Sequence, residues 1–430
     1  FKVKLLIKNG RVVDPENKID EVRDVLVEDG YIIDVAANIV ADDAKIIEAS
    51  NHLVCPGFID IHVHLREPGE EYKETIATGT RAAAVGGFTS VCCMPNTRPV
   101  MDTAAVANFV KERALRSGVV NVYPIGAVTK GQAGQELSEI AHLIAAGCVA
   151  ISDDGEPVRK AGIMRNALEY AKMFDMPVLS HCEDTSLSEN GQMSEGYYST
   201  FYGLKGIPAA AEDVIVARDI LLSKLTGGHI HICHISTKSS VELVREAKNE
   251  GVNITAEVTP HHLTLTDEIV GTYDTDTKVF PPLRSSEDVA ELIKAINDGT
   301  IDCIATDHAP HHFESKDCEY DLAAFGISGL ETAIPVVMSL VNNGELSIEQ
   351  MVSLFTYKAA QIVGIDKGNL SIGSSADITI IDPDLEKEVE VKNFYSKGKN
   401  TPFKGQIFKG WPVLTLVNGK IIASNGEILE

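Results

Sequence analysis

The sequence has little of several features that mark common classes of protein. Its 430 residues include only 8 cysteines and no CxxC pair, which argues against a disulfide framework and a cysteine-ligated zinc site. No apolar run is long enough to cross a bilayer, and the first residues show no signal-peptide pattern. Positive charge is also scarce, since the formal net charge of -24 disfavours nucleic acid and anionic membranes as partners. We therefore expect a cytoplasmic protein with reduced thiols.

A glycine fingerprint of the GxGxxG kind is also missing after the first strand, which disfavours an open, doubly wound sheet. The middle of the chain instead alternates apolar runs with amphipathic segments such as 106–118, 241–251 and 287–299, which read as helices ending near glycine. The apolar runs are 53–64, 88–96, 121–129, 148–155, 177–184, 229–236, 253–262 and 302–311. Eight strand–helix repeats predict an α/β fold with a closed (β/α)8 barrel of the TIM type.

Both ends of the chain have a different character and read as short strands joined by tight turns. Asn9-Gly10, Asp29-Gly30 and Asn418-Gly419 each lie between apolar runs, and these dipeptides favour the turn of an antiparallel hairpin. Chain ends often lie close together. We therefore expect a small β-sandwich domain from residues 1–55 and 367–430, beside a metal-binding barrel of residues 56–366.

Seven of the eight apolar runs end in polar or ionisable residues. In a (β/α)8 barrel these strand ends open onto one face, which carries the active site, so residues distant in sequence should converge there. Imidazoles and carboxylates without thiolates suit zinc or a similar divalent ion. The residues at these ends are His62, His64, Arg66, Asn96, Asp153, Asp154, His181, His234, His261, His262, Asp307, His308 and His311.

The pair His62 and His64 is the most informative part of this set. Residues two apart on a strand point to the same face, and two imidazoles on one face of a buried strand need a partner. A single histidine at a strand end is more often a structural residue, so His181 and His234 gain their weight from the whole set. Four histidines and two aspartates exceed the needs of one tetrahedral ion, which predicts two ions that share a carboxylate.

Two longer motifs resemble a known family. "DIHVHLREPG" (60–69) and "ATDHAPHHFESK" (305–316) are similar to the two signature motifs of dihydroorotase, within the cyclic amidohydrolases. "ISDDG", "SHCED", "CHIST" and "EVTPHH" fit the same family in order and spacing, so the resemblance covers essentially the whole chain. It implies a (β/α)8 barrel with a small β-sandwich. It also implies a zinc-dependent hydrolase that interconverts N-carbamoyl-L-aspartate and L-dihydroorotate in pyrimidine (UMP) biosynthesis.

The resemblance also implies a set of metal ligands for two zinc ions per subunit, with a single tightly bound ion as the alternative. Many relatives bridge the ions with a carboxylated lysine, but "AISDDG" contains no lysine, so an aspartate is expected to bridge. Neighbouring strand residues face opposite ways, and we expect Asp154 rather than Asp153 to reach the metals. The expected ligands are His62, His64, Asp154, His181, His234 and Asp307, and Asp307 is also the expected catalytic general acid/base.

For the substrate, the resemblance implies that Arg66 and Asn96 hold a carboxylate, which suits an acidic chain that needs a local guanidinium for an anion. Many members of the subgroup carry asparagine where this chain has Phe280, so one polar substrate contact is expected to be missing. The expected substrate-binding residues are His64, Arg66, Asn96, His311, Phe325 and Gly326.

Two other functions compete with this interpretation. A hydantoinase or allantoinase would use the same metal chemistry, but its substrate lacks the ring carboxylate that would explain Arg66 and Asn96. A non-catalytic scaffold beside aspartate transcarbamoylase would be expected to have lost metal ligands, and here every ligand position is filled. A small-molecule substrate is expected in either enzyme, while a homodimer and a complex with aspartate transcarbamoylase both stay open.

Overall fold

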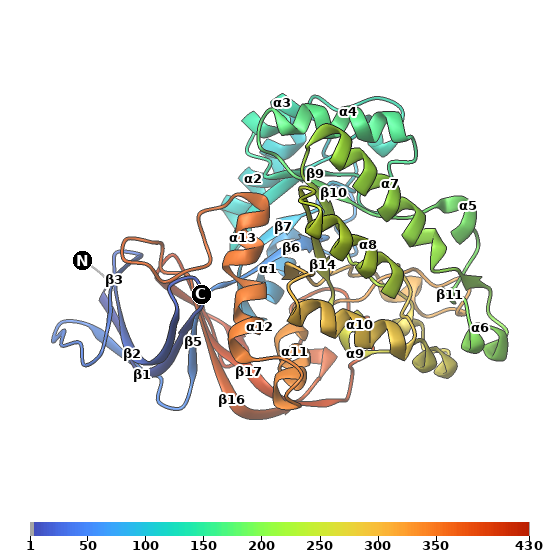
Figure 1. Cartoon of the computed structure of the whole chain (residues 1–430). Helices are drawn as coiled ribbons and strands as arrows, with labels where there is room; N and C mark the ends of the chain where they lie inside the picture. Colours follow the sequence, from blue (N-terminus) through green and yellow to red (C-terminus); the bar gives the residue numbers. More distant parts are fainter. Residues whose placement is uncertain (1–3, 430) are drawn as a thin grey trace.

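The computed structural model describes residues 4–429 and contains two large sheets (Figure 1). One sheet is an eight-stranded parallel barrel surrounded by helices, and the other is a nine-stranded sheet built from both ends of the chain. In Figure 1 the strands of the two chain ends lie side by side on the left, and the barrel with its helices fills the right. The predicted fold class is therefore confirmed, including the contribution of both chain ends to one sheet region.

Each of the eight predicted apolar runs contains one strand of the barrel. The strand order is β15-β14-β13-β10-β9-β8-β7-β6, and all neighbours in it are parallel. A parallel bridge between Val63 of β6 and His308, which lies just beyond β15, nearly closes the barrel. The strands are β6 (Phe58–Val63), β7 (Phe88–Cys93), β8 (Asn121–Gly126), β9 (Ala150–Ser152), β10 (Val178–Ser180), β13 (Ile230–Ile232), β14 (Ile254–Val258) and β15 (Cys303–Ile304).

The helices around the barrel follow the predicted amphipathic pattern. In α8 (Lys238–Asn249), the buried residues Val241, Val244 and Ala247 recur at helical spacing, and Thr237 caps the first turn. The other longer helices are α1 (Ile76–Val85), α2 (Ala104–Ser117), α3 (Ile140–Ala145), α4 (Ala161–Lys172), α7 (Ala210–Thr226), α10 (Ser286–Asn297), α11 (Ala333–Asn342), α12 (Ile348–Phe355) and α13 (Tyr357–Val363).

The shorter elements outside the two large sheets span at most six residues each. They are α5 (Thr185–Ser188), α6 (Tyr197–Tyr202), α9 (Pro260–Thr264), the strands β11 (Met193–Ser194) and β12 (Gly206–Ile207), and the 3-10 turns η1 (Lys130–Gln132), η2 (Asp267–Thr272), η3 (Thr275–Thr277), η4 (Phe313–Ser315) and η5 (Val391–Asn393).

The nine-stranded sheet runs β19-β18-β17-β16-β5-β1-β2-β3, with β4 paired to β1. Strand β16 from the C-terminal part pairs antiparallel with β5 from the N-terminal part, and this contact joins the two chain ends. The strands are β1 (Lys4–Asp14), β2 (Ile19–Glu28), β3 (Tyr31–Ala36), β4 (Lys45–Glu48), β5 (Leu53–Pro56), β16 (Ile378–Glu388), β17 (Ile407–Val417), β18 (Lys420–Ser424) and β19 (Glu427–Ile428).

Two of the three predicted hairpin turns are confirmed, and one is wrong. Asp29-Gly30 joins β2 to β3, and Asn418-Gly419 joins β17 to β18. Asn9-Gly10 instead lies inside β1, because β2 is long enough to pair with both halves of that strand. The dipeptide forms a bulge there, with Asn9 at φ +63°. A Cβ on Gly10 would lie 2.4 Å from Val54, so the tight packing against β5 also requires glycine.

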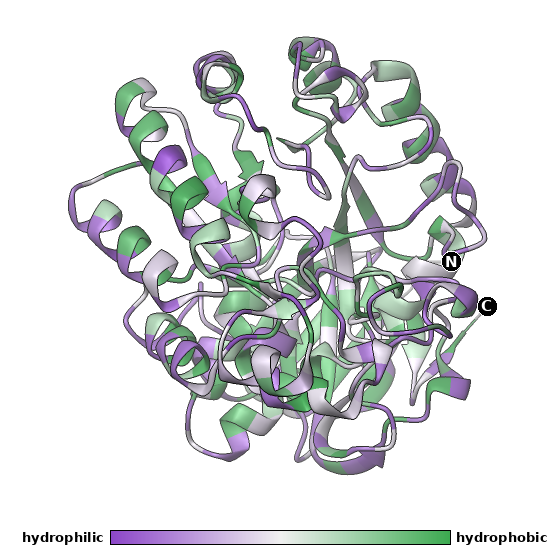
Figure 2. Cartoon of the chain, turned by 90° about the vertical axis from the view of Figure 1, so that its right-hand side faces the viewer, coloured by the Kyte–Doolittle hydropathy of each residue, from purple (hydrophilic) through white to green (hydrophobic). Residues whose placement is uncertain are grey.

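The hydrophobic core fills the barrel interior and the space between the barrel and its helices. Figure 2 shows hydrophobic residues on the interior strands and alternating hydrophobic and hydrophilic stretches along the outer helices. All eight cysteines are free thiols and seven of them are buried. Among residues 4–429, no helix combines the length and the apolar character needed to cross a membrane.

Candidate functional site

The strand ends of the barrel bring the predicted metal ligands together. His62 lies on β6, and His64, Asp154, His181, His234 and Asp307 follow β6, β9, β10, β13 and β15 within a few residues. All six side chains are buried. They lie at or beside a cavity of about 660 Å³, which is lined by five of them. This is the carboxyl-terminal face of the barrel, where the active sites of this fold lie.

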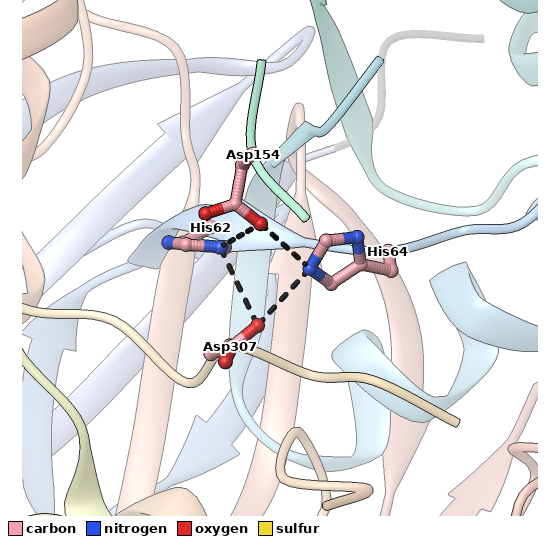
Figure 3. A group of neighbouring side chains, drawn as sticks. All are labelled: His62, His64, Asp154 and Asp307. Atoms are coloured by element: carbon pink, nitrogen blue, oxygen red, sulfur yellow. Dashed lines mark hydrogen bonds and ion pairs between the residues drawn. The ribbon is translucent and has the colours of Figure 1, made fainter. Parts of the chain in front are cut away.

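Four of these residues form one compact group (Figure 3). His62 Nε2 lies 3.2 Å from an Asp154 oxygen and 3.4 Å from Asp307 Oδ1. His64 Nε2 lies 3.0 Å from Asp307 Oδ1 and 3.4 Å from the same Asp154 oxygen, Oδ2. Ligand atoms about 2.0–2.1 Å from a tetrahedral zinc ion lie about 3.3 Å apart. The spacing of these atoms therefore matches that of a four-coordinate metal site.

A second group lies on the other side of Asp154. The Oδ1 atom of Asp154 lies 3.5 Å from His181 Nδ1 and 3.3 Å from His234 Nε2, and these two ring nitrogens are 3.1 Å apart. The Oδ2 atom faces His62 and His64, so each oxygen of one carboxylate faces a different pair of histidines. This arrangement is what a carboxylate that bridges two ions requires.

Among residues 4–429, two buried atoms of these groups also lack a hydrogen-bond partner, which is a further sign of a bound cation. Within the described chain, His62 Nε2 and Asp154 Oδ1 are buried and have no hydrogen-bond partner. A buried polar atom without a partner is costly, so both atoms call for a ligand. Burial opposes the charged form of His62, but Asp154, Glu257 and Asp307 raise its pKa well above the ordinary value. A site with this concentration of carboxylate charge is suited to a divalent cation.

The two candidate aspartates after β9 face opposite ways. Asp153 accepts hydrogen bonds from the backbone N–H of Thr129 at 3.1 Å and from its hydroxyl at 2.5 Å. Burial raises the pKa of Asp153 to about 6. The structure therefore places Asp154 among the histidines and Asp153 outside them, in the orientation that alternation along a strand predicts.

The outer nitrogen of three imidazoles has its own partner, which fixes the ring orientation. His62 Nδ1 lies 2.5 Å from Glu257 Oε1, His64 Nδ1 donates to Asn96 Oδ1 at 2.8 Å, and His181 Nε2 lies 2.9 Å from Glu183 Oε2. Such contacts orient metal-binding histidines and leave the other nitrogen free for the ion.

Sequence reasoning missed Glu257 and Glu183. Glu257 is a lone acid inside the apolar run "ITAEV" of β14, and a fully buried charge of this kind signals a paired partner. Glu183 follows His181 by two residues in "SHCED", so an acid two positions from a candidate ligand was the available signal.

The predicted substrate residues line the same cavity. Arg66 is only 7% exposed, and its Nε donates to the carbonyl of Pro310 at 3.3 Å, which leaves the outer guanidinium nitrogens available. His311 Nε2 donates to the carbonyl of Phe325 at 2.8 Å, and burial followed by the charge of Arg66 lowers the pKa of His311 to about 2. His311 is thus a neutral residue whose buried Nδ1 has no partner within the described chain.

Phe280, the departure from the family pattern, forms an apolar wall beside these groups. Its ring lies 5.6 Å from that of His181 and 5.6 Å from that of Phe325, centroid to centroid. The site therefore has a charged end at Arg66 and an aromatic side next to His181.

Three residues of the site have positive φ angles, in the left-handed region of backbone conformation that residues other than glycine rarely adopt. The φ angles are +62° for Arg66, +32° for His234 and +48° for Asp307. Such conformations persist only where surrounding contacts enforce them, and they concentrate at functional sites.

Besides His311, three histidines at the strand ends lie outside both groups. The ring of His262 contacts Thr259 and the carbonyl of Pro281, and His308 Nε2 donates to Glu74 at 3.1 Å. His261 is buried next to His262, and burial lowers its pKa well below the ordinary value. None of the three belongs to a group that could hold a metal ion within residues 4–429.

Comparisons with known proteins agree with this geometry. A family profile described as "Dihydro-orotase-like" matches residues 51–240, and one described as "Amidohydrolase family" matches residues 330–423. The chain is 58% identical over 428 residues to a protein named "Dihydroorotase" from Pelotomaculum thermopropionicum. The matched region covers 99% of this chain and 100% of that protein. It is 52% identical over 426 residues to the "Dihydroorotase" of Acetivibrio thermocellus, with the same coverage.

Solved structures show the same architecture at lower identity. The L-hydantoinase of Arthrobacter aurescens superposes with a TM-score of 0.89 at 27% identity, over 99% of this chain and 97% of that one. The D-hydantoinase from Thermus sp. gives a TM-score of 0.84 at 26% identity, over 99% and 96% of the two chains. The amidohydrolase relationship and the two residue groups together indicate a metal cofactor.

Proposed function

The chain belongs to the dihydroorotase family of the amidohydrolases, and we propose that it catalyses the reversible cyclisation of N-carbamoyl-L-aspartate to L-dihydroorotate and water. It is a metal-dependent cyclic amide hydrolase. The observation that carries the proposal is the 58% identity over the whole chain with a dihydroorotase. The buried guanidinium of Arg66 in the metal-group cavity supports it, because an acidic protein needs such a group to bind a carboxylated ring. The reaction belongs to pyrimidine (UMP) biosynthesis, which suggests a cytoplasmic location.

For the cofactor we propose two zinc ions per chain. His62, His64 and Asp307 would hold one ion, His181 and His234 the other, and Asp154 would bridge them with its two oxygens. When bound, the ions supply a nucleophilic hydroxide near neutral pH and polarise the amide carbonyl. The imidazole and carboxylate donors and the spacing of about 3.3 Å expected around zinc support this assignment.

Asp307 is the proposed general acid/base. Its carboxylate lies at the edge of the cavity, and His62 and His64 favour its ionised form, so the pKa of Asp307 is lowered although burial opposes this. In ring opening, Asp307 accepts a proton from the attacking water and returns it to the departing ring nitrogen. In ring closure, the protonated carboxyl of Asp307 carries out the same proton transfers in the reverse order.

Arg66 and Asn96 are proposed to hold the substrate carboxylate. Asn96 Oδ1 is occupied by His64 Nδ1, so its amide N–H groups remain to donate to an anion beside the guanidinium. His311 and the backbone of Phe325 and Gly326 complete the binding site on the opposite loop. Fixing the ring in this way aligns its amide carbonyl with the metal groups.

The experiment compares turnover of dihydroorotate with that of hydantoin and allantoin in the wild type and in Arg66→Ala. We expect dihydroorotate to be the preferred substrate. Loss of Arg66 should raise its KM about 10- to 100-fold, the usual value of a charged hydrogen-bond pair. The matched control is Arg98→Ala, which removes an arginine whose side chain is 80% exposed.

Two results would contradict the proposal. Faster turnover of hydantoin than of dihydroorotate would favour the hydantoinase alternative. The structural likeness to hydantoinases is the observation that favours this alternative. An unchanged KM in Arg66→Ala would remove Arg66 from the carboxylate site.

A further inference from the structure

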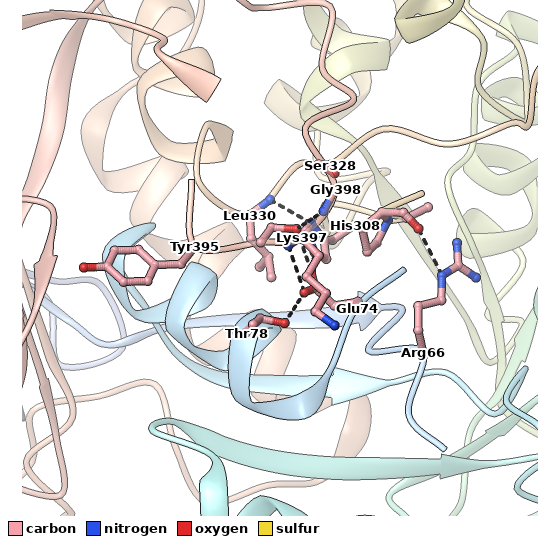
Figure 4. Close-up of polar contacts among 12 residues, drawn as sticks. Arg66, Glu74, Thr78, His308, Ser328, Leu330, Tyr395, Lys397 and Gly398 are labelled. Atoms are coloured by element: carbon pink, nitrogen blue, oxygen red, sulfur yellow. Dashed lines mark hydrogen bonds and ion pairs between the residues drawn. The ribbon is translucent and has the colours of Figure 1, made fainter. Parts of the chain in front are cut away.

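A segment between the last 3-10 turn and β17 passes along the mouth of the barrel. We name residues 394–401 the strap; they connect η5 to β17 and follow β16 in the chain, so they belong to the part that builds the nine-stranded sheet. Figure 4 shows Lys397 and Gly398 of the strap gathered around Glu74 together with His308 of the barrel. The strap is thus a direct link between the sheet region and the loop that follows β15.

Two carboxylates of the barrel hold the backbone of the strap. Glu74 accepts hydrogen bonds from Ser396 Oγ at 2.5 Å and from the backbone N–H of Lys397 at 3.1 Å. Glu331 accepts from the backbone N–H groups of Tyr395 and Ser396 at 3.1 and 3.0 Å. Burial opposes the ionised form of Glu74, but His308 lowers its pKa, so the hydrogen bonds to Glu74 are of the stronger, charge-assisted kind. Together with the backbone hydrogen bonds to Glu331, they fix the path of the strap.

The strap also comes unusually close to the site loops. A Cβ on Gly398 would lie 2.5 Å from Pro310 Cβ and 2.7 Å from Ser328 Oγ. Only glycine permits this approach, and it brings the side chain of Asn400, two residues further along the strap, between the two loops.

Asn400 is buried and uses its whole amide group on these loops. Its Oδ1 accepts from the backbone N–H of His311 at 3.1 Å and from Ser328 Oγ at 3.0 Å. Its Nδ2 donates to the carbonyls of Ala309 at 3.3 Å and Gly326 at 3.0 Å. Its own carbonyl accepts from the backbone N–H of Ser328 at 2.8 Å.

These partners fix the orientation of the amide without ambiguity. A backbone N–H only donates and a backbone carbonyl only accepts, so the oxygen must face His311 and the nitrogen must face Ala309 and Gly326. One side chain therefore ties the loop of residues 309–311 to the loop of residues 326–328. The proposed substrate contacts His311 and Gly326 lie on these two loops.

We propose that Asn400 is a positioning residue that sets the spacing between His311 and the Phe325-Gly326 backbone and so aligns the substrate-binding loops. This inference rests on the proposed function for its substrate but not for its geometry. Asn400 belongs to neither metal group, so its effect should fall on substrate binding and leave the metal ions in place.

The test is Asn400→Asp, which keeps the size of the side chain and replaces the two amide N–H donors with an oxygen. That oxygen would face the carbonyls of Ala309 and Gly326 and repel them, which should separate the loops. We expect KM for dihydroorotate to rise about tenfold, the value of roughly 1.4 kcal/mol in binding. We expect kcat to fall less than about threefold, and the metal content of the purified chain to match the wild type.

The control is Asn393→Ala, which removes an exposed asparagine just before the strap whose amide contacts Glu390. It should leave KM, kcat and metal content unchanged. If Asn400→Asp lowers the melting temperature but leaves kcat/KM unchanged, Asn400 is only structural and the proposal fails. Loss of metal together with kcat would also overturn it, because the residue would then act on the metal groups.

A second variant keeps the proposal testable if Asn400→Asp does not fold. Ser328→Ala removes one of the bonds that orient the amide, and KM should rise by about threefold to fivefold; an unchanged KM would count against the proposal. Wild-type turnover of dihydroorotate tests the proposed function separately. If the wild type prefers another cyclic amide, the ratio of variant to wild-type KM is measured with that amide, and the inference about Asn400 is still decided.

Discussion

Glu257 contacts one histidine of the metal groups and a second histidine inside the barrel. Its two oxygens contact His62 Nδ1 and His231 Nε2, at 2.5 and 2.9 Å, and both histidines favour its ionised form, so its pKa is lowered although burial opposes this. The carboxylate thereby fixes which ring nitrogen of His62 faces Asp154 and Asp307. A residue that never contacts the ion can in this way control how tightly the ion binds.

We predict that Glu257→Gln weakens metal binding about 10- to 100-fold, because glutamine cannot supply the charge that orients His62. The measurement is the metal dissociation constant from competition with a chelator. The control is Glu212→Gln, a buried glutamate that contacts Ser236 and Arg284 rather than a histidine. Equal metal affinity in Glu257→Gln and the wild type would refute the role given to Glu257.

At the residue scale, the sequence predicted which residues meet at the cavity. It did not predict the residues that hold those side chains and loops in place. His62 and His64 follow from the two-residue period of a strand, whereas the same alternation says only that one of Asp153 and Asp154 should face the histidines, not which one. Glu257 and Asn400 could not be found in this way, because their partners lie 195 and 89 residues away in the chain. Only the folded arrangement shows those contacts.

At the scale of elements, the loop after β15 is held by a buried lysine. Lys316 is 7% exposed, and its Nζ donates to the carbonyls of Thr275 at 3.0 Å and Lys278 at 3.2 Å. Burial lowers the pKa of Lys316 to about 8, from an ordinary value of 10.5. Below pH 8 the folded state therefore carries the cost of a buried ammonium group, which deprotonation relieves.

The pKa of this lysine predicts a pH-dependent stability. Between pH 8 and 10.5 the unfolded chain binds more protons at this position than the folded chain, so stability rises with pH in that window. Relative to Lys316→Met, the wild type should gain up to about 3 kcal/mol across the window, since each pKa unit corresponds to about 1.4 kcal/mol. Urea unfolding of both proteins at several pH values measures the difference.

The control for this prediction is Lys404→Met, which removes an exposed lysine near the same loop. The pH dependence of the stability of Lys316→Met is compared with that of Lys404→Met, which also loses one lysine. A stability difference between Lys316→Met and the wild type that does not change with pH would show that Lys316 is not buried in its charged form at neutral pH.

Elements were predicted from the sequence with one instructive error. The eight barrel strands follow from the eight apolar runs, and the apolar spacing of α8 follows from helix periodicity. Asn9-Gly10 failed because its positive φ suits a bulge as well as a hairpin turn. The pairing of β2 with all of β1 decides between the two, and that pairing is not local.

At the scale of the whole molecule, two sheets from interleaved parts of the chain share one functional region. The barrel supplies the imidazoles, the carboxylates and Arg66, while the strap from the C-terminal part supplies Asn400 at the same mouth. The sequence predicted the barrel because its repeats are local patterns. It did not predict the strap, because that segment carries no periodic signal and takes its path from contacts with Glu74 and Glu331.

The central claim is that histidines and carboxylates from distant strands hold two divalent ions around Asp154. Anomalous diffraction at the zinc absorption edge, from crystals of the zinc-loaded protein, tests this claim most directly. We predict two peaks of anomalous density per chain, one beside His62 and His64 and one beside His181 and His234, with Asp154 between them. No peak at these residues, or a peak elsewhere in the molecule, would contradict the account.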